Sequence, residues 1–121
     1  MVASPDDPAR SIPLRPVELQ ILLVLAEGEA HGYHVIRRTR ERTEGAVDLL
    51  PGTLYRALQR LEAQGWVRRT EGPLEVELED PRRRYYALTT TGRRVVAAEL
   101  RRLERLVRVG RELDLLGPET A

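Results

Sequence analysis

The segment from Pro51 to Val67, PGTLYRALQRLEAQGWV, constrains the fold of this chain more than any other. Three leucines recur within it at i, i+4 and i+7, the spacing that puts side chains on one face of a helix: Leu54, Leu58 and Leu61. Gly65 supplies a helix stop, and residues 66–70 have the composition of a strand. The segment therefore predicts a helix from Pro51 to about Gln64 that leads directly into a strand.

A second informative segment, RRRYYALTTTG, runs from Arg82 to Gly92. Residues 84–88 predict a strand that returns from a charged loop, and residues 74–79 before it alternate with period two. Asp80-Pro81 predicts the turn between these two runs. Any of residues 89–91 can be the N-cap of a last helix that continues to about Leu116.

Two further helices are expected upstream. The first runs from Pro16 to Glu27 and is followed by Gly28. It is apolar on nearly every side, which is typical of a helix sandwiched between other elements. The second covers residues 31–42 and is ended by Glu44-Gly45.

This order of elements predicts a mainly α fold with a small two-stranded β-wing, a winged helix-turn-helix, plus a C-terminal dimerisation helix. Residues 1–13 are expected to form a flexible arm, because they mix Pro, Asp, Ser and Arg without periodicity. Residues 14–90 are expected to form the winged helix-turn-helix domain, and residues 91–121 the dimerisation helix and tail.

Charge is distributed in blocks along the chain, although the net charge of the 121 residues is only +1. Residues 1–30 carry five acids and two arginines, and residues 31–70 carry four acids and eight arginines. Residues 71–81 carry five acids and no arginine, whereas residues 82–121 carry ten arginines and five acids. Such local basic patches, rather than the sum, decide whether a protein attracts nucleic acid.

Several classes of chemistry are disfavoured. The chain has no cysteine, so disulfides and thiolate chemistry are excluded. His31 and His34 could share a metal, but no third ligand follows from their spacing. No catalytic constellation and no phosphate-binding loop is found, so we expect neither an enzyme nor a cofactor. The N-terminus lacks the apolar run of a signal peptide, and residues 21–26 are too short to span a membrane. A soluble, cytoplasmic protein is expected.

The predicted helix 51–64 carries the candidate DNA-reading residues. Opposite its leucines, at about 100° per residue, lie Arg56, Gln59 and Arg60, whose side chains can hydrogen-bond guanine and adenine edges. Thr53 lies at the margin of this face, near backbone amides suited to a phosphate. The ring of Tyr55 can pack while its hydroxyl reaches a phosphate. The alternative interpretation is an ordinary solvated helix.

The other aromatic residues are expected mainly in the core, namely Trp66 and one of Tyr85 and Tyr86.

The predicted tip of the wing carries three adjacent arginines, Arg82, Arg83 and Arg84, which can follow phosphates or enter a narrow minor groove. The acidic run 74–79 complicates this picture, because its glutamates would repel a phosphate backbone if they faced it. The arginines could alternatively belong to a solvated turn or pair with those acids.

The last helix shows an apolar seam with a spacing of three and four residues, as in coiled coils. Its members are Val96, Leu100, Leu103, Val107 and Leu113. The seam predicts a homodimer, with packing inside one chain as the alternative. Two-fold symmetry would present two reading helices to half-sites about one DNA turn apart.

Three segments together resemble the PadR-like transcriptional regulators, in their short form with one C-terminal helix: ILLVLAEGEAHGYHVI, PGTLYRALQRLEAQGWV and RRYYALTTTG. The match extends from about Leu19 to Gly92. The resemblance implies a homodimeric winged-helix repressor whose final helix swaps over the partner's first helix. It implies that Thr53 and Tyr55 belong to the DNA-reading segment and that Arg83 and Arg84 are basic wing residues.

The chain also departs from that family. Leu50 replaces the Ser that often precedes Pro-Gly-Thr, and Arg56 replaces a common proline. The last helix has no aromatic residue, so binding of flat aromatic drugs is not carried over.

We therefore expect a sequence-specific transcriptional regulator, a repressor that binds a palindromic operator in double-stranded DNA. Helix 51–64 would enter the major groove, and the wing at 71–84 would lie on the flanking backbone or minor groove. Any small-molecule effector is unknown, and no membrane partner is expected. The alternatives are a winged-helix module that binds protein through its acidic strand, and a ligand-sensing relative of the MarR type.

Overall fold

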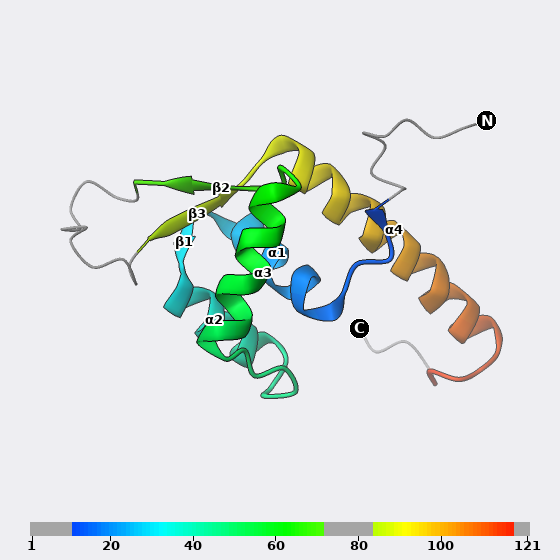
Figure 1. Cartoon of the computed structure of the whole chain (residues 1–121). Coiled ribbons are helices and arrows are strands. Elements are labelled where there is room, and N and C mark those ends of the chain that lie inside the picture. Colours follow the sequence, from blue (N-terminus) through cyan, green and yellow to red (C-terminus); the bar gives the residue numbers. More distant parts are fainter. Residues whose placement is uncertain (1–10, 72–83, 118–121) are drawn as a thin grey trace.

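The computed structural model describes residues 11–71 and 84–117, and Figure 1 shows the arrangement of their helices and strands. The predicted strand at 74–79, its turn, and the wing residues Arg82 and Arg83 lie outside the described residues. In chain order the elements are α1 (Pro16–Glu27), β1 (Ala30–His31), α2 (Gly32–Arg42), α3 (Pro51–Ala63), β2 (Val67–Thr70), β3 (Tyr85–Leu88) and α4 (Thr90–Glu112).

Helix α1 is the centre of the molecule. It contacts α2, α3, β3 and α4, which explains why its sequence is apolar on nearly every side. Ile21 and Leu22 are fully buried there, and the three leucines predicted to face the core from α3 are buried as well. Trp66 and Tyr86 join the same core, as the sequence predicts.

The sheet has three antiparallel strands in the order β1-β3-β2. Strands β2 and β3 confirm the strands expected at residues 66–70 and 84–88, and they pair with each other. Strand β1 was not predicted: Ala30 pairs with Tyr86 and His31 with Tyr85. This short strand ties the link between α1 and α2 to β3, so this helix link and the β2–β3 pair share one sheet.

The motif Leu-Thr-Thr-Thr-Gly at 88–92 joins the sheet to α4. Thr89 is the N-cap of α4: its hydroxyl accepts a hydrogen bond from the Gly92 amide at 3.0 Å and donates to the Gly65 carbonyl at 2.6 Å. A methyl group on Gly92 would collide with the carbonyl oxygen of Trp66. The glycine therefore allows the first turn of α4 to lie directly against the backbone of Trp66, between α3 and β2.

Helix α4 has two different halves. Val95, Val96 and Glu99 in its first half are buried, whereas its second half extends away from the other helices (Figure 1). Val96 belongs to the core of its own chain, which corrects its assignment to a dimer seam. The helix ends at Glu112 rather than near Leu116.

The segment before α1 also packs on the domain. Ile12 lies against the core and Leu14 is buried. The buried carboxylate of Glu99 accepts the backbone N–H of Leu14 at 2.7 Å and the Nε–H of Arg102 at 2.5 Å. Of the arm expected for residues 1–13, Ile12 packs against the core, and the chain is held by α4 from Leu14 onward. Residues 1–10 lie outside the described residues.

Candidate nucleic-acid interface

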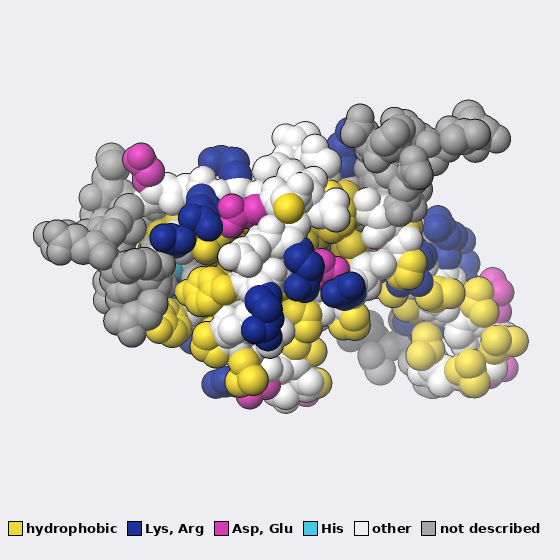
Figure 2. All heavy atoms as spheres, viewed as in Figure 1, with side chains coloured by type: hydrophobic (Ala, Val, Ile, Leu, Met, Phe, Trp, Pro, Cys, Tyr) yellow, Lys and Arg dark blue, Asp and Glu magenta, His cyan; other side chains and the backbone are white. Residues whose placement is uncertain are grey.

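Helix α3 presents one continuous polar face, and every residue predicted to lie on it is exposed: Gly52, Arg56, Gln59, Arg60 and Ala63. Thr53 is half-buried at the margin. Figure 2 views the molecule from the side on which α3 lies, and basic side chains gather near the middle of this view. The face offers two guanidinium groups and one amide without any carboxylate of α3 between them.

The start of α3 has no side-chain cap. Its N-cap residue is Leu50, which has no acceptor on its side chain, and Pro51 follows at the first helical position. Unpaired amides at a helix start attract anions, because they add to the positive end of the helix dipole. The replacement of Ser by Leu at residue 50 therefore leaves this end uncapped from within the chain.

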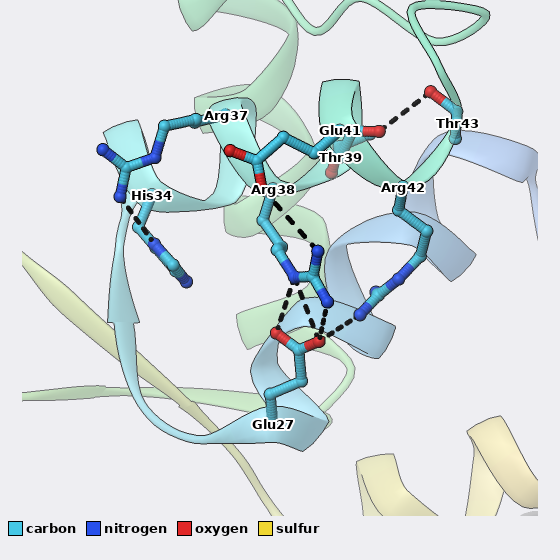
Figure 3. A network of polar contacts seen from close by, with 8 residues as sticks. All are labelled: Glu27, His34, Arg37, Arg38, Thr39, Glu41, Arg42 and Thr43. Carbon is cyan, nitrogen blue, oxygen red and sulfur yellow. Dashed lines mark hydrogen bonds and ion pairs between the residues drawn. The ribbon is translucent and has the colours of Figure 1, made fainter.

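Most arginines of α2 are neutralised by nearby acids. Figure 3 shows Arg38 and Arg42 of α2 converging on the carboxylate of Glu27 at the end of α1. The Arg38–Glu27 ion pair spans 3.0 Å, and Arg40 pairs with Asp48 at 2.7 Å. The hydrogen bond from Arg38 lowers the pKa of Glu27 below its usual value. The two pairs with Glu27 connect α2 to the end of α1, and each of the three pairs places a negative charge beside an arginine of α2.

Arg56 on α3 differs from these arginines. Within residues 11–71 and 84–117, no carboxylate lies within ion-pair distance of Arg56. Arg60 approaches only Glu18, at 3.9 Å. The polar face of α3 therefore keeps one arginine without an acidic partner among the described residues and a second one with a distant partner.

Tyr55 is positioned by a glycine. Its ring packs against the core, and a methyl group on Gly32, the first residue of α2, would lie 2.7 Å from the Tyr55 hydroxyl oxygen. The hydroxyl therefore lies over the start of α2. Sequence reasoning predicted the packed ring but not this contact, which depends on the crossing of α2 and α3.

The two histidines have local roles. His31 is the N-cap of α2: its Nδ1 accepts the backbone N–H of His34 at 3.1 Å. The Nδ1 of His34 lies 3.2 Å from the guanidinium of Arg37 (Figure 3). The ring of His31 meets that of Tyr85 edge to face at 5.4 Å. Among residues 11–71 and 84–117, no group of three or more metal-binding side chains occurs.

The wing is described only at its base. Arg84 is exposed at the start of β3, whereas Arg82 and Arg83 lie outside the described residues. On the neighbouring strand, Arg69 pairs with Glu62 of α3 at 3.2 Å, and Arg68 is exposed. Arg68 was missed by sequence reasoning, although its position beside the wing makes it a further basic residue on this side.

A second missed residue is Arg15, the N-cap of α1. It lines a groove of about 660 Å³ that also contains Glu18 and Arg60. The groove continues the polar face of α3 toward the start of α1. No sequence pattern links residue 15 to residue 60, so only the fold brings these two arginines to one groove.

The second half of α4 carries exposed apolar side chains. Leu100 is 43% exposed and Val107 is 46% exposed, although both continue the stripe that is buried at Val96. Leu103 is half-buried and Leu113 exposed, and Leu106 adds to the same surface. Figure 2 shows hydrophobic atoms gathered on this end of the molecule. An apolar surface of this kind is typical of a protein interface.

The described helices span no membrane, since none of them is both long and apolar enough.

Three helices, a short strand between the first two, and an antiparallel pair after the third define a winged helix-turn-helix, a fold class of DNA-binding proteins. The model of the "Transcriptional regulator PadR-like family" matches residues 21–98. The chain belongs to this family and is a PadR-family transcriptional regulator.

Two curated relatives are similar in sequence. Transcriptional regulator Rv3488 from Mycobacterium tuberculosis is 38% identical over 93 residues, which cover 76% of this chain and 79% of the relative. An uncharacterized 37.1 kDa protein in transposon TN4556 from Streptomyces fradiae is 40% identical over 89 residues. That match covers 74% of this chain but only 23% of the transposon protein.

Solved structures share the fold. A transcriptional regulator from Clostridium thermocellum superposes with a TM-score of 0.65 at 28% identity, covering 92% of this chain and 97% of its own. Bacillus subtilis PadR, solved in complex with operator DNA, has a TM-score of 0.60 at 23% identity. The latter match covers 71% of this chain and 47% of the Bacillus protein, and it supports the fold alone.

Proposed function

We propose that the protein binds a palindromic operator as a homodimer and represses transcription there. The observation that carries this proposal is the polar face of α3, where Arg56, Gln59 and Arg60 are exposed together on a helix held rigidly by its buried leucines. Fixed guanidinium and amide groups on one helix face suit the base edges of the major groove. Bacillus subtilis PadR, which has the same fold, has been solved with operator DNA.

The proposed contacts divide into two kinds. Arg56, Gln59 and Arg60 read bases, whereas Thr53 and Tyr55 near the start of α3 contact the backbone. The uncapped start of α3 supports a phosphate contact there. Arg82, Arg83 and Arg84 follow the flanking backbone or minor groove from the wing.

Dimerisation through α4 is proposed from its exposed stripe. Leu100, Leu103 and Val107 lie in the part of α4 that extends beyond the other helices, and Leu113 follows directly at its C-cap, so that a second copy can cover all four. A two-fold axis through such a contact presents two copies of α3 to two half-sites. The family resemblance supports repression as the outcome of operator binding.

The two kinds of contact can be separated by mutation. Arg60→Ala is expected to cost about 1–3 kcal/mol on the specific operator and to relax sequence preference. Arg84→Ala is expected to weaken all duplexes alike and to flatten the salt dependence, because it removes a phosphate contact. The measurement is a fluorescence titration of a duplex selected by the wild-type protein and of a shuffled duplex, at fixed salt and in a salt series.

Arg101→Ala serves as the control, because Arg101 is exposed on α4 outside the proposed interface. If the α3 and wing variants bind both duplexes as the wild type does, these surfaces do not contact DNA and the proposed assignment is wrong.

A further inference from the structure

The groove beside the second half of α3 has three walls from distant parts of the chain. Ser11, Leu14 and Arg15 come from the segment that precedes α1, Glu18 from the first turn of α1, and Arg60 and Gln64 from α3. Its position is fixed, because Leu14 is buried and its amide is held by the buried carboxylate of Glu99. The groove is therefore a built feature of the domain and not the gap beside a loose chain end.

The charges in the groove are unequal. Glu18 is the one carboxylate among its described lining residues, against Arg15 and Arg60. The side chain of Glu18 is 13% exposed and its carboxylate faces Arg60, with Oε2 lying 3.9 Å from Nε. Arg15 is exposed, and within residues 11–71 and 84–117 no carboxylate lies within ion-pair distance of it. One positive charge in the groove is left for an outside anion.

The shape of the groove indicates which anion. A small-molecule pocket encloses most of its ligand and is mainly apolar, whereas this groove is open along one side and polar. It borders a helix proposed to lie in the major groove, which is about 12 Å wide and flanked by the two phosphate backbones. A residue beside that helix therefore meets a backbone, and the planar fork of arginine matches phosphate oxygens in pairs.

We propose that this groove holds one phosphate of the DNA backbone, with Arg15 as the residue that contacts it. The proposal rests on the proposed function, because it places α3 in the major groove. The carboxylate of Glu18 faces Arg60 and not Arg15. In this proposal Arg60 therefore reads a base, whereas Arg15 binds the backbone. The arm before α1 thus contributes a contact on the opposite flank of α3 from the wing.

The test uses the full-length chain and a labelled duplex selected from a random-sequence library, with a shuffled duplex for comparison. Both are titrated by fluorescence anisotropy between about 50 and 200 mM salt. Arg15→Gln is expected to weaken both duplexes by the same factor, leave their affinity ratio unchanged, and reduce the slope of log K against log salt by about 1. Arg15→Lys should restore the slope, because it keeps the charge.

Arg101→Gln is the matched control, since it removes the same charge from an exposed arginine on α4. An unchanged slope for Arg15→Gln, with selective binding by the wild type, overturns the phosphate contact and leaves the proposed function intact. A changed affinity ratio with the slope intact overturns it as well, because Arg15 would then read a base. If the wild type selects no duplex, the proposed function fails and this contact fails with it. Circular dichroism of each variant verifies that its helices are retained.

Discussion

At the scale of single residues, two sequence motifs of this chain are explained by helix caps and by close contacts at glycines. In His-Gly-Tyr, His31 caps α2 and Gly32 leaves room for the hydroxyl of Tyr55. In Thr-Thr-Thr-Gly, Thr89 caps α4 and Gly92 lets it approach Trp66. The two caps mark where α2 and α4 begin, and the two glycines allow the close contacts of these helix starts with Tyr55 and Trp66.

The cap at His31 gives a prediction at this scale. His31→Ala is expected to reduce the free energy of unfolding by about 0.5–2 kcal/mol, since it leaves an amide of the first turn of α2 unpaired. His31→Asn loses the same ring contact with Tyr85 but retains a capping oxygen, so the difference between the two variants isolates the cap. Urea unfolding measures it. Equal stability of the Ala and Asn variants would show that the cap contributes nothing.

The exposed face of α3 could be predicted from the sequence, whereas the contacts of its neighbours could not. Helical spacing alone separates Leu58 from Arg60, and both lie as expected. Arg15 was missed because its position beside Arg60 depends on how α1 crosses α3. The close contact between Gly32 and the Tyr55 hydroxyl likewise depends on how α2 crosses α3, and no local sequence pattern predicts that crossing.

At the scale of elements, the two halves of α4 have different surroundings. Its first half packs on α1 and fixes the segment before α1 through Glu99, whereas its second half is free of the domain. Apolar residues recur at the same spacing in both halves. The sequence therefore predicted one apolar stripe but not whether the same chain or a partner buries each part of it. Val96 was assigned to a partner for this reason, although its own chain buries it. Strand β1 was missed because two residues are too few to show a period.

Glu99 gives a prediction on pH. The hydrogen bond from Arg102, opposed by burial and aided by the Leu14 amide, lowers the pKa of Glu99 below its usual 4.5. A carboxyl whose pKa is lowered by folding stabilises the fold above its unfolded pKa and loses that effect as the pH falls through the folded value. Glu99→Gln should therefore lower the Tm near neutral pH, and the difference from wild type should shrink below about pH 4.5.

The matched control for this prediction is Glu104→Gln on the exposed side of α4. Its Tm is expected to follow the wild type closely at every pH, because surface ion pairs contribute little. A constant Tm difference for Glu99→Gln down to pH 3 would mean that the charge of Glu99 does not stabilise the contact between α4 and the segment before α1.

At the scale of the whole molecule, the proposed account requires two chains. One domain presents a single reading helix, with the wing base on one flank and the Arg15 groove on the other. The apolar stripe of α4 lies apart from this face, so a partner can cover the stripe without obstructing DNA (Figure 2). The winged helix-turn-helix could be predicted from the sequence, because each of its main elements carries its own local pattern. The partner could only be inferred, since one chain contains no information on what meets its exposed face.

The most direct test of this account is hydroxyl-radical footprinting on the selected duplex, with the wild type and with Leu103→Glu/Val107→Glu. The wild type is expected to protect two segments related by two-fold symmetry, with centres about 10 base pairs apart or a multiple of that. The double variant, with charges on the exposed stripe, should lose this paired protection at the same concentration. A single protected segment for the wild type, or an unchanged paired footprint for the double variant, would contradict operator binding by a homodimer joined through α4.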